Sequence, residues 1–520
     1  MEKKHLIFKN MSLVSLGIMV SRILGYFRDM LVASMFGAGF YADTFYAAFR
    51  IPNLFRRLFG ESSLNAVFVP VFSEVLQKGQ KQKVEEFISA VSTVMFILLG
   101  IITILGIILA FPITKLITWG FPQEKIVLTS KLLQTMFPYM ILICFAALWL
   151  SILNCLKIFF VPAMSSSSLS ITEIIFVLFI AYSLPEHKRV YGLAISVLAG
   201  GVLQFFINYL MVVNKYDIRL KLEKIFYYIS LPEIKKMYLL FVPVIVGFST
   251  DQINALVDTL CASFLKEGSV TALYYSNRLM QLPLALFAVS MVTVALPQMS
   301  AEAVSNNYDE LKQTLIQSIR NITFFVLPAA IGLIILGKPI IKVLFERGKF
   351  TQQATSVTYS CLAFYSIGLL SFSLSKIFIS VFYALKNTKY PVKIAFYTLI
   401  LNIGLNIILM QFLAVGGLAL ATSISSTVAV ILLWSKMEQK VKTGVFLALK
   451  NFFIKILIVN ILFFIFLLLL KLVVNNTFLL TFIGILFGIL FYLLCSSLFK
   501  IEETKIISKF ISRYIPFVYD

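Results

Sequence analysis

The chain carries basic side chains inside segments that are otherwise apolar enough to cross a membrane. An arginine at the centre of a membrane helix costs about 2.5–3.5 kcal/mol, and such residues normally face a cavity or a substrate pathway. Guanidinium groups bind phosphate oxygens through paired hydrogen bonds. We therefore expect a water-filled, cationic cavity that binds an anionic molecule residing in the membrane. The candidate binding residues are Arg22, Arg28, Arg50, Arg56, Arg57, Arg278 and Lys376.

Carboxylates in the same segments could neutralise part of this charge. Asp43, Arg50 and Arg57 recur at intervals of seven, which is roughly one helical stripe. Pairing alone does not balance the first two segments, because they hold five arginines against three carboxylates. Arg56 and Arg57 could instead extend their charged ends to the membrane surface. The acidic residues concerned are Asp29, Asp43, Glu61, Asp251 and Asp258, and we expect Asp29, Asp43 and Glu61 to act in charge pairing or gating.

A second polar group combines amides with a hydroxyl. Asn402 and Asn406 are four residues apart on one predicted helix, and Thr422 on the next helix and Asp258 could join them. Such oxygens could hold a sodium ion or relay a proton. Asn and Thr also hydrogen-bond neighbouring membrane helices to one another, so both interpretations remain open.

The composition excludes most soluble classes of protein. Soluble domains are about 45–50% apolar and about 25% charged, whereas 60% of this chain is hydrophobic and 13% is charged. The five cysteines have no metal-ligand spacing, and no phosphate-cradling loop or nucleophile motif is present. We therefore expect a protein that is not an enzyme and has no bound cofactor. The net charge of +21 requires no nucleic acid, because basic loops facing anionic lipid explain most of it.

Apolar segments of about 20 residues or more predict an all-α polytopic membrane protein with about 14 transmembrane helices. An even number puts both termini on one side. If that side is the cytoplasm, about 25 Lys and Arg lie in the termini and even-numbered loops and about ten in the opposite loops, as the positive-inside rule requires. We expect the first helix to be retained, because no small-residue cleavage pattern follows it. The predicted spans are 10–37, 40–74, 84–111, 125–155, 162–184, 190–213, 237–265, 270–300, 313–337, 353–385, 391–412, 416–435, 450–473 and 477–499.

The chain also matches itself at a shift of about 228 residues, as internally repeated transporters do. Each copy contains six spans, so the two copies cross the membrane in the same sense. We expect them to be related by an axis along the membrane normal, with substrate handled between them. The matched pairs include Asp29 with Asp258, Arg50 with Arg278, and Lys157 with Lys386.

The repeat predicts five regions. They are an N-terminal six-helix lobe at 1–213, an interfacial amphipathic linker at 214–236, a C-terminal six-helix lobe at 237–437, two extra helices at 450–499 and an interfacial amphipathic helix at 500–520. The linker and the last region carry basic and apolar residues on opposite faces, which is typical of helices in the headgroup layer. The two extra helices could be a stabilising hairpin or a groove for a lipid tail.

Several stretches resemble the MurJ/MviN family, which belongs to a larger group with MATE drug exporters and polysaccharide-lipid flippases. The opening stretch at 21–29, SRILGYFRD, is highly specific, and the resemblance extends over essentially the whole chain. The other matching stretches are 36–39, 42–45, 52–57, 68–70, 277–283 and 382–386.

The resemblance implies a flippase for lipid II, the undecaprenyl-pyrophosphate-linked disaccharide-pentapeptide used in peptidoglycan synthesis, cell-wall biogenesis and the control of cell shape. It implies movement from the inner to the outer leaflet of the cytoplasmic (inner) membrane by alternating access. It also implies that the two extra helices form a groove for the polyprenyl tail. Membrane lipids and other cell-wall synthesis proteins are the further partners it suggests. Because no nucleotide site is evident, we expect coupling to Na⁺, H⁺ or the membrane potential.

The family's functional positions can be transferred residue by residue. Its arginines map onto Arg22, Arg28, Arg56 and Arg278, and its acidic and polar positions map onto Asp29, Asp43 and Asn53. Gln281 departs from the pattern, because the family often has an acidic residue there. We expect Asp29 to pair with arginines and to bias one conformation. We also expect Arg28→Ala and Arg278→Ala to abolish transport without loss of folding.

Two other classes of function remain open. One is a cation-coupled exporter, or a flippase of another polyprenyl-linked glycan, although the two extra spans and the arginine-rich first hairpin argue against a small-molecule exporter. The other is a membrane enzyme acting on lipid-linked sugars. Such enzymes usually need a carboxylate cluster or metal site in a sizeable loop, and no loop here exceeds about 25 residues.

Overall fold

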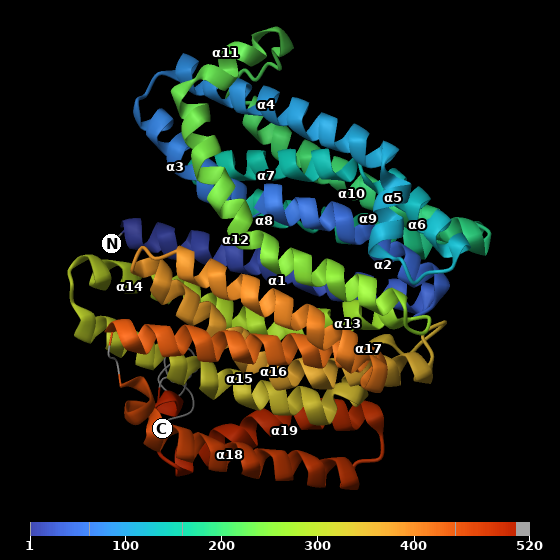
Figure 1. Ribbon diagram of the computed structural model, residues 1–520, viewed down its shortest axis with the longest axis vertical. Helices are drawn as coiled ribbons and strands as arrows, with labels where there is room; N and C mark the ends of the chain where they lie inside the picture. Colours follow the sequence, from blue (N-terminus) through green and yellow to red (C-terminus); the bar gives the residue numbers. More distant parts are fainter. Residues whose placement is uncertain (1, 62, 159, 442–443, 506–520) are drawn as a thin grey trace. The chain divides into compact units, whose positions relative to one another are not determined.

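The computed structural model describes residues 2–61, 63–158, 160–441 and 444–505, and every regular element in these ranges is a helix (Figure 1). In lipid, a helix satisfies its own backbone hydrogen bonds, so long apolar runs fold this way. Among the described residues, nine helical stretches are long and apolar enough to cross a membrane. One of them, at 389–439, bends at Ala414 and so contains two of the predicted spans. The all-α membrane fold is thus confirmed.

The chain forms two compact units. The first comprises residues 1–270 with 347–350, and α7 lies at its centre, packed against α3, α4 and α10. Its elements are α1 (Glu2–Phe36), α2 (Phe40–Phe55), η1 (Arg56–Glu61), α3 (Ser63–Gln77), α4 (Lys81–Ile108), α5 (Ala110–Ile117), α6 (Gln123–Met136), α7 (Tyr139–Cys155), α8 (Phe160–Ser165), α9 (Ser168–Ile175), η2 (Phe176–Ile180), η3 (Ala181–Ser183), α10 (Glu186–Val213), η4 (Leu222–Lys224), α11 (Ile225–Ser230) and α12 (Pro232–Ser263).

The second unit comprises residues 271–346 and the described residues from 351 to 505. Its α16 packs against α14, α15 and α17, while α18 and α19 pack against each other and against α15. Its elements are α13 (Ser269–Pro283), η5 (Leu284–Val289), α14 (Ser290–Val304), α15 (Tyr308–Phe345), α16 (Gln352–Ala384), α17 (Lys389–Val441), α18 (Val445–Val473) and α19 (Thr477–Leu498). Contacts place α12 with the first unit, whereas the sequence repeat places it in the second lobe; the lobe limits therefore remain a prediction.

Details of the backbone recur at the offset seen in the sequence. Lys157 and Lys386, which are 229 residues apart, follow the ends of α7 and α16, and both have a positive φ. A positive φ is uncommon for a residue with a side chain, so its recurrence at matched positions supports the duplication. A π-helical segment also follows the second helix of each copy, as η1 after α2 and as η5 after α13.

The predicted linker at 214–236 is partly helical, and its place at the membrane interface remains a prediction. Within 214–236, Ile225–Ser230 is α-helical and α12 begins at Pro232, while residues 217–221 run extended along α4. The backbone N–H groups of residues 217, 219 and 221 donate to Glu85 Oε1, Ser89 Oγ and Thr93 Oγ1 at 3.1, 3.3 and 3.2 Å. The donors are two residues apart in the extended segment and the acceptors are four residues apart on α4. The two spacings match, because two residues of extended chain and four residues of helix each advance by about 6–7 Å. The side chains of α4 therefore hold this segment straight.

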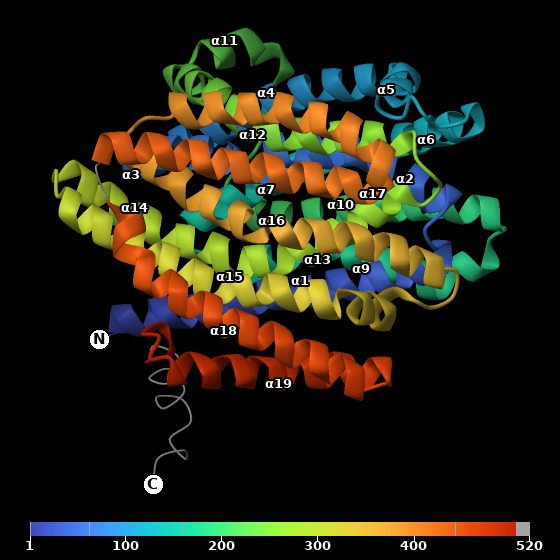
Figure 2. The same cartoon turned by 60° about the horizontal axis from the view of Figure 1, so that its bottom comes forward.

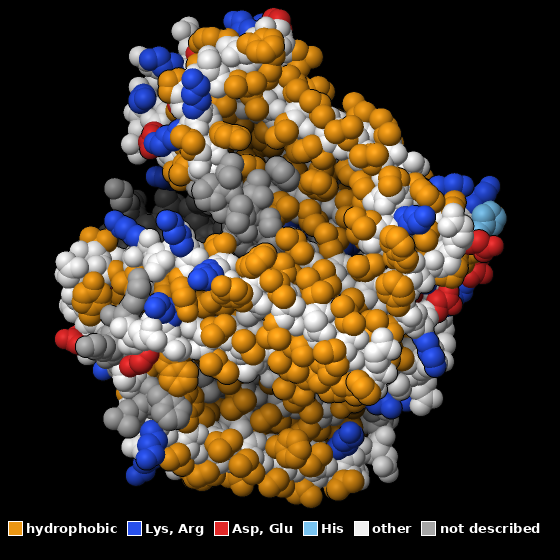
Figure 3. Space-filling model, in the orientation of Figure 1, with side chains coloured by type: hydrophobic (Ala, Val, Ile, Leu, Met, Phe, Trp, Pro, Cys, Tyr) orange, Lys and Arg blue, Asp and Glu red, His pale blue; other side chains and the backbone are white. Residues whose placement is uncertain are grey.

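The last two helices are the most apolar part of the chain and lie side by side in both views (Figures 1 and 2). Many of their large side chains are exposed, as a lipid-facing surface requires; Leu472 and Leu494 are examples. Hydrophobic side chains likewise cover most of the face drawn in Figure 3, with Lys and Arg mainly near its left and right margins. Of the predicted C-terminal helix at 500–520, residues 506–520 lie outside the described part of the chain.

Candidate functional site

The predicted cationic site begins on α1, where Arg28 is 7% exposed. Its Nε and Nη2 atoms donate to Asp29 Oδ1 at 3.0 and 2.7 Å. Glu173 Oε2, from α9, lies 3.7 Å from Arg28 Nε. Both carboxylates are buried. The expected pairing of Asp29 with an arginine is therefore present, and a second carboxylate stands beside the same guanidinium.

Asp43, near the start of α2, has a basic partner that the sequence did not suggest. Lys125 Nζ, from α6, lies 2.9 Å from Asp43 Oδ2, and both residues are buried. The backbone N–H of Gly268 donates to the same oxygen at 2.8 Å. This ion pair joins α2 to α6 and to the turn between α12 and α13.

Three further candidates lie along α2 and η1 and are half-buried. Arg50 Nε donates to Thr259 Oγ1 at 3.2 Å, next to buried Asp258 on α12. Arg56 Nε donates to Asn53 Oδ1 at 3.0 Å. These bonds hold guanidinium groups at defined positions while leaving part of each side chain exposed, as a polar binding surface requires.

The proposed stripe of Asp43, Arg50 and Arg57 needs one correction. The α-helix ends at Phe55, and residues 56–61 form a π-helix, so the helical register changes before Arg57. Arg57 is half-buried in that segment. The side chain of Glu61 lies outside the described part of the structure.

The remaining cationic candidates are also half-buried: Arg22 on α1, Arg278 on α13 and Lys376 on α16. Gln281 Nε2 donates to Asn277 Oδ1 one turn earlier on α13, so this departure from the family pattern is accommodated locally. Partial exposure distinguishes these residues from Arg28. Their proposed contact with substrate remains a prediction.

The amide and hydroxyl group of α17 is connected as predicted. Asn406 Nδ2 donates to Asn402 Oδ1 at 3.1 Å, and Asn402 Nδ2 donates to Thr422 Oγ1 at 3.3 Å. Both amides are buried, and the bond from Asn402 to Thr422 joins the two arms of α17 across the bend at Ala414. Asp258 belongs to the first unit. This arrangement suits packing between helices, and cation binding here remains a prediction.

The sequence pattern alone did not single out two residues, Glu173 and Lys125. Glu173 is an acidic residue within the predicted span 162–184, and that signal was available. Lys125 stands at the first position of the span 125–155, where a basic residue usually lies in the headgroup layer. Its burial follows from tertiary packing, because the rings of Phe121 and Phe40 lie 4.2 and 5.6 Å from its Nζ.

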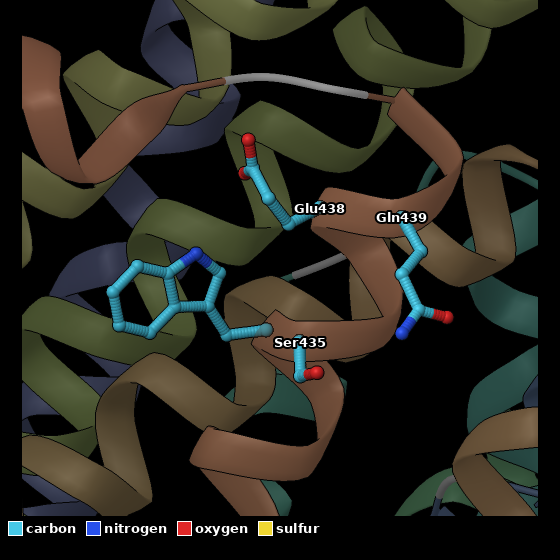
Figure 4. Close-up of a pocket in the computed structure, with 4 residues that line it drawn as sticks. Ser435, Glu438 and Gln439 are labelled. Atoms are coloured by element: carbon cyan, nitrogen blue, oxygen red, sulfur yellow. The ribbon is translucent and has the colours of Figure 1, made fainter.

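Two other features lie apart from these residues. A cavity of about 500 Å³ is lined by Trp434, Ser435, Glu438 and Gln439 near the end of α17 (Figure 4). All four residues come from one helix, so the cavity is a surface hollow of that helix. Among the described residues, no group of three His, Cys, Asp or Glu is placed to hold a metal ion.

Comparison with known proteins gives a consistent result. The sequence profile of the family described as "Lipid II flippase MurJ" matches residues 32–490. A protein of Vibrio cholerae named "Probable lipid II flippase MurJ" is 37% identical over 438 residues, or 82% of each chain. A protein of the same name from Buchnera aphidicola subsp. Baizongia pistaciae is 36% identical over 436 residues, which cover 83% of this chain and 84% of that one.

Solved structures agree. The structure described as "Lipid II flippase MurJ, inward closed conformation" superposes with a TM-score of 0.77 at 30% identity, over 94% of this chain and 98% of that chain. An inward-facing MATE family multidrug transporter of the MOP superfamily superposes with a TM-score of 0.69 at 15% identity, over 83% of this chain and 99% of that chain. The second likeness concerns the fold alone.

Proposed function

Since the chain belongs to the lipid II flippase MurJ family, we propose that it moves lipid II from the inner to the outer leaflet of the cytoplasmic membrane. The observation that carries the proposal is the set of arginines within membrane-spanning helices. Their guanidinium groups suit the pyrophosphate that links the glycan to its polyprenyl chain.

The ion pair of Arg28 suggests how substrate binds. In a medium of low dielectric constant, an isolated guanidinium is costly, and Asp29 reduces that cost while the site is empty. A pyrophosphate offers the same paired oxygens with more negative charge. We infer that substrate oxygens replace the carboxylate at Arg28, while the half-buried Arg22 and Arg56 of the same unit supply further contacts.

Alternating access completes the proposal. A family relative adopts a state described as inward closed, and the MATE relative is inward-facing, so the fold supports distinct conformations. The headgroup would enter from the cytoplasmic side while the polyprenyl tail stays in lipid, and both termini would lie in the cytoplasm. The last two helices, with their exposed apolar surface, are the proposed tail-binding region.

The proposed driving force is an ion gradient or the membrane potential. A potential of 100 mV is worth about 2.3 kcal/mol per charge moved. Na⁺ is the candidate ion for the group formed by Asn402, Asn406 and Thr422. Translocation is measured in Na⁺ and in choline, each with and without an imposed membrane potential. Transport that depends on Na⁺ but not on the potential supports coupling to Na⁺. Transport that depends on the potential but not on Na⁺ supports the membrane potential as the driving force.

Binding and product analysis test the substrate. Purified protein should bind lipid II more tightly than undecaprenyl pyrophosphate that carries a different glycan, and lipid II should be recovered chemically unchanged. Equal or absent binding would overturn the assignment to lipid II. Chemical turnover of a labelled substrate would instead support a membrane enzyme.

A further inference from the structure

Several turns of the first unit gather at one end of it. The backbone N–H of Lys349 donates to the carbonyl of Ser34 at 2.8 Å, and that of Gly120 donates to Ser263 Oγ at 3.0 Å. The predicted topology puts this end on the outer side of the membrane. The turns concerned are 37–39 between α1 and α2, 118–122 between α5 and α6, 264–268 between α12 and α13, and 347–350 between α15 and α16.

Glycine lets these turns meet backbone to backbone. Gly37, Gly268 and Gly348 have φ values of +66°, +88° and +58°, in the region that favours glycine. A Cβ atom on them would lie 2.4 Å from the carbonyl oxygen of Lys349, 2.7 Å from that of Ala38 and 2.2 Å from that of Ser34, respectively. The contact therefore leaves no room for side chains at these three positions.

The buried ion pair of Lys125 and Asp43 lies against one of these turns, at Gly268. Asp43 Oδ2 accepts from both Lys125 Nζ and the Gly268 N–H, so one oxygen atom connects α6, α2 and the turn after α12. Lys125 and Asp43 are 3% and 1% exposed. Glu267 Oε1 lies 3.9 Å from Lys125 Nζ, and its side chain is largely exposed.

We propose that Lys125 is a positioning residue that holds Asp43 against the Gly268 turn, and that the three together form a latch keeping this end of the transporter closed. The inference rests on the proposed alternating access. Removing Lys125 alone leaves the Asp43 carboxylate buried without the Lys125 ammonium group. A buried carboxylate in this state is stabilised by contact with water, so we expect the turns around it to separate. The two charges of the latch cannot be exchanged, because the residue at position 43 must accept a hydrogen bond from the Gly268 N–H as well as pair with the residue at position 125.

Three variants distinguish the proposed latch from an ion pair that would work equally well with its two charges exchanged. Lys125→Arg keeps the cation. The double variant Asp43→Asn/Lys125→Met removes both charges but keeps an oxygen that can accept from Gly268. The exchange Asp43→Lys/Lys125→Asp keeps an ion pair but loses the acceptor at position 43. The latch predicts that the first two variants stay closed and that the exchange opens.

The test uses the full-length protein with Ser269→Cys as reporter, because Ser269 follows Gly268 and is 4% exposed. A membrane-impermeant thiol reagent, added from outside, measures the labelling rate relative to the protein without the reporter. If the open state is normally about 1–10% populated, Lys125→Met should raise the rate several-fold, up to a ceiling of about tenfold to a hundredfold. The exchange variant should label equally fast, whereas Lys125→Arg and the double neutral variant should label at the parent rate.

Two outcomes would overturn the latch: a parent-like rate for Lys125→Met, or restoration of the parent rate by the charge exchange. Thermal unfolding of each variant in detergent is measured alongside, and fast labelling supports the latch only in variants that unfold near the parent temperature. If Lys125→Met does not fold, the contrast between the double neutral and exchange variants decides the question. Parent protein that translocates lipid II normally while the latch test fails would refute the latch and leave the proposed function intact.

Discussion

Two helix hairpins of this protein treat charge in opposite ways. The hairpin of α1 and α2, with η1, carries five arginines, and its Arg28 and Asp43 are buried within protein. The hairpin of α18 and α19 carries three lysines, all on α18, and exposes large apolar side chains such as Phe487 and Leu494. The difference teaches that basic side chains occur within the spans where carboxylates or amides hydrogen-bond with them. The spans that face lipid are apolar instead.

The largest predicted effect concerns the buried pair of the first hairpin. Arg28→Ala leaves Asp29 and Glu173 buried beside a missing cation and should lower the free energy of unfolding by about 3–5 kcal/mol. This revises the expectation that the variant folds normally, because the burial of Arg28 was not evident from the sequence. Chemical unfolding in detergent checks the value, and Arg28→Ala/Asp29→Ala should recover part of the loss. Parent-like stability of Arg28→Ala would contradict the paired, buried state.

The second prediction inverts the comparison by placing an arginine in the apolar hairpin. Phe487 lies near the middle of α19 and is 51% exposed. Phe487→Arg should oppose membrane insertion of α19 by about 2.5–3.5 kcal/mol, because no carboxylate belongs to that helix. A glycosylation-based insertion assay measures this, with Phe487→Leu as the matched control. Full insertion of the arginine variant would mean that this face lines water rather than lipid.

The third and smallest effect concerns an ion pair at the end of the apolar hairpin. Arg320 Nε and Nη2, from α15, donate to the two carboxylate oxygens of buried Glu503 at 2.6 and 3.2 Å, and the Arg320 guanidinium lies 5.1 Å from the centre of the Phe452 ring on α18. Glu503→Gln should cost about 1.5–3 kcal/mol, the value of a hydrogen bond to a charged group. Hydrogen exchange of residues 499–505 should rise in this variant. It should rise less in Glu502→Gln, because Glu502 also pairs with Arg320, at 2.8 Å, but its side chain is 71% exposed. Unchanged exchange would show that the pair does not hold the hairpin's end.

Hydropathy predicted the helices well, because each span must satisfy its own backbone and cover about 30 Å of hydrocarbon. It also located the arginines within the spans, since charge in an apolar run needs an explanation. Hydropathy could not predict ion-pair partners that are distant in the sequence. Glu173 pairs with Arg28, and Lys125 pairs with Asp43, because α9 packs beside α1 and α6 packs beside α2. The π-helix after Phe55 and the extended linker held by Ser89 and Thr93 depend on packing and not on periodicity.

The central claim is that guanidinium groups within the spans bind the pyrophosphate of lipid II during transport. Arg278 tests it most directly, because this half-buried residue should affect binding more than folding. In a leaflet-resolved assay with labelled lipid II in proteoliposomes, Arg278→Ala should abolish translocation while the surface control Arg219→Ala transports normally. Normal translocation by Arg278→Ala, at parent-like stability, would contradict the claim.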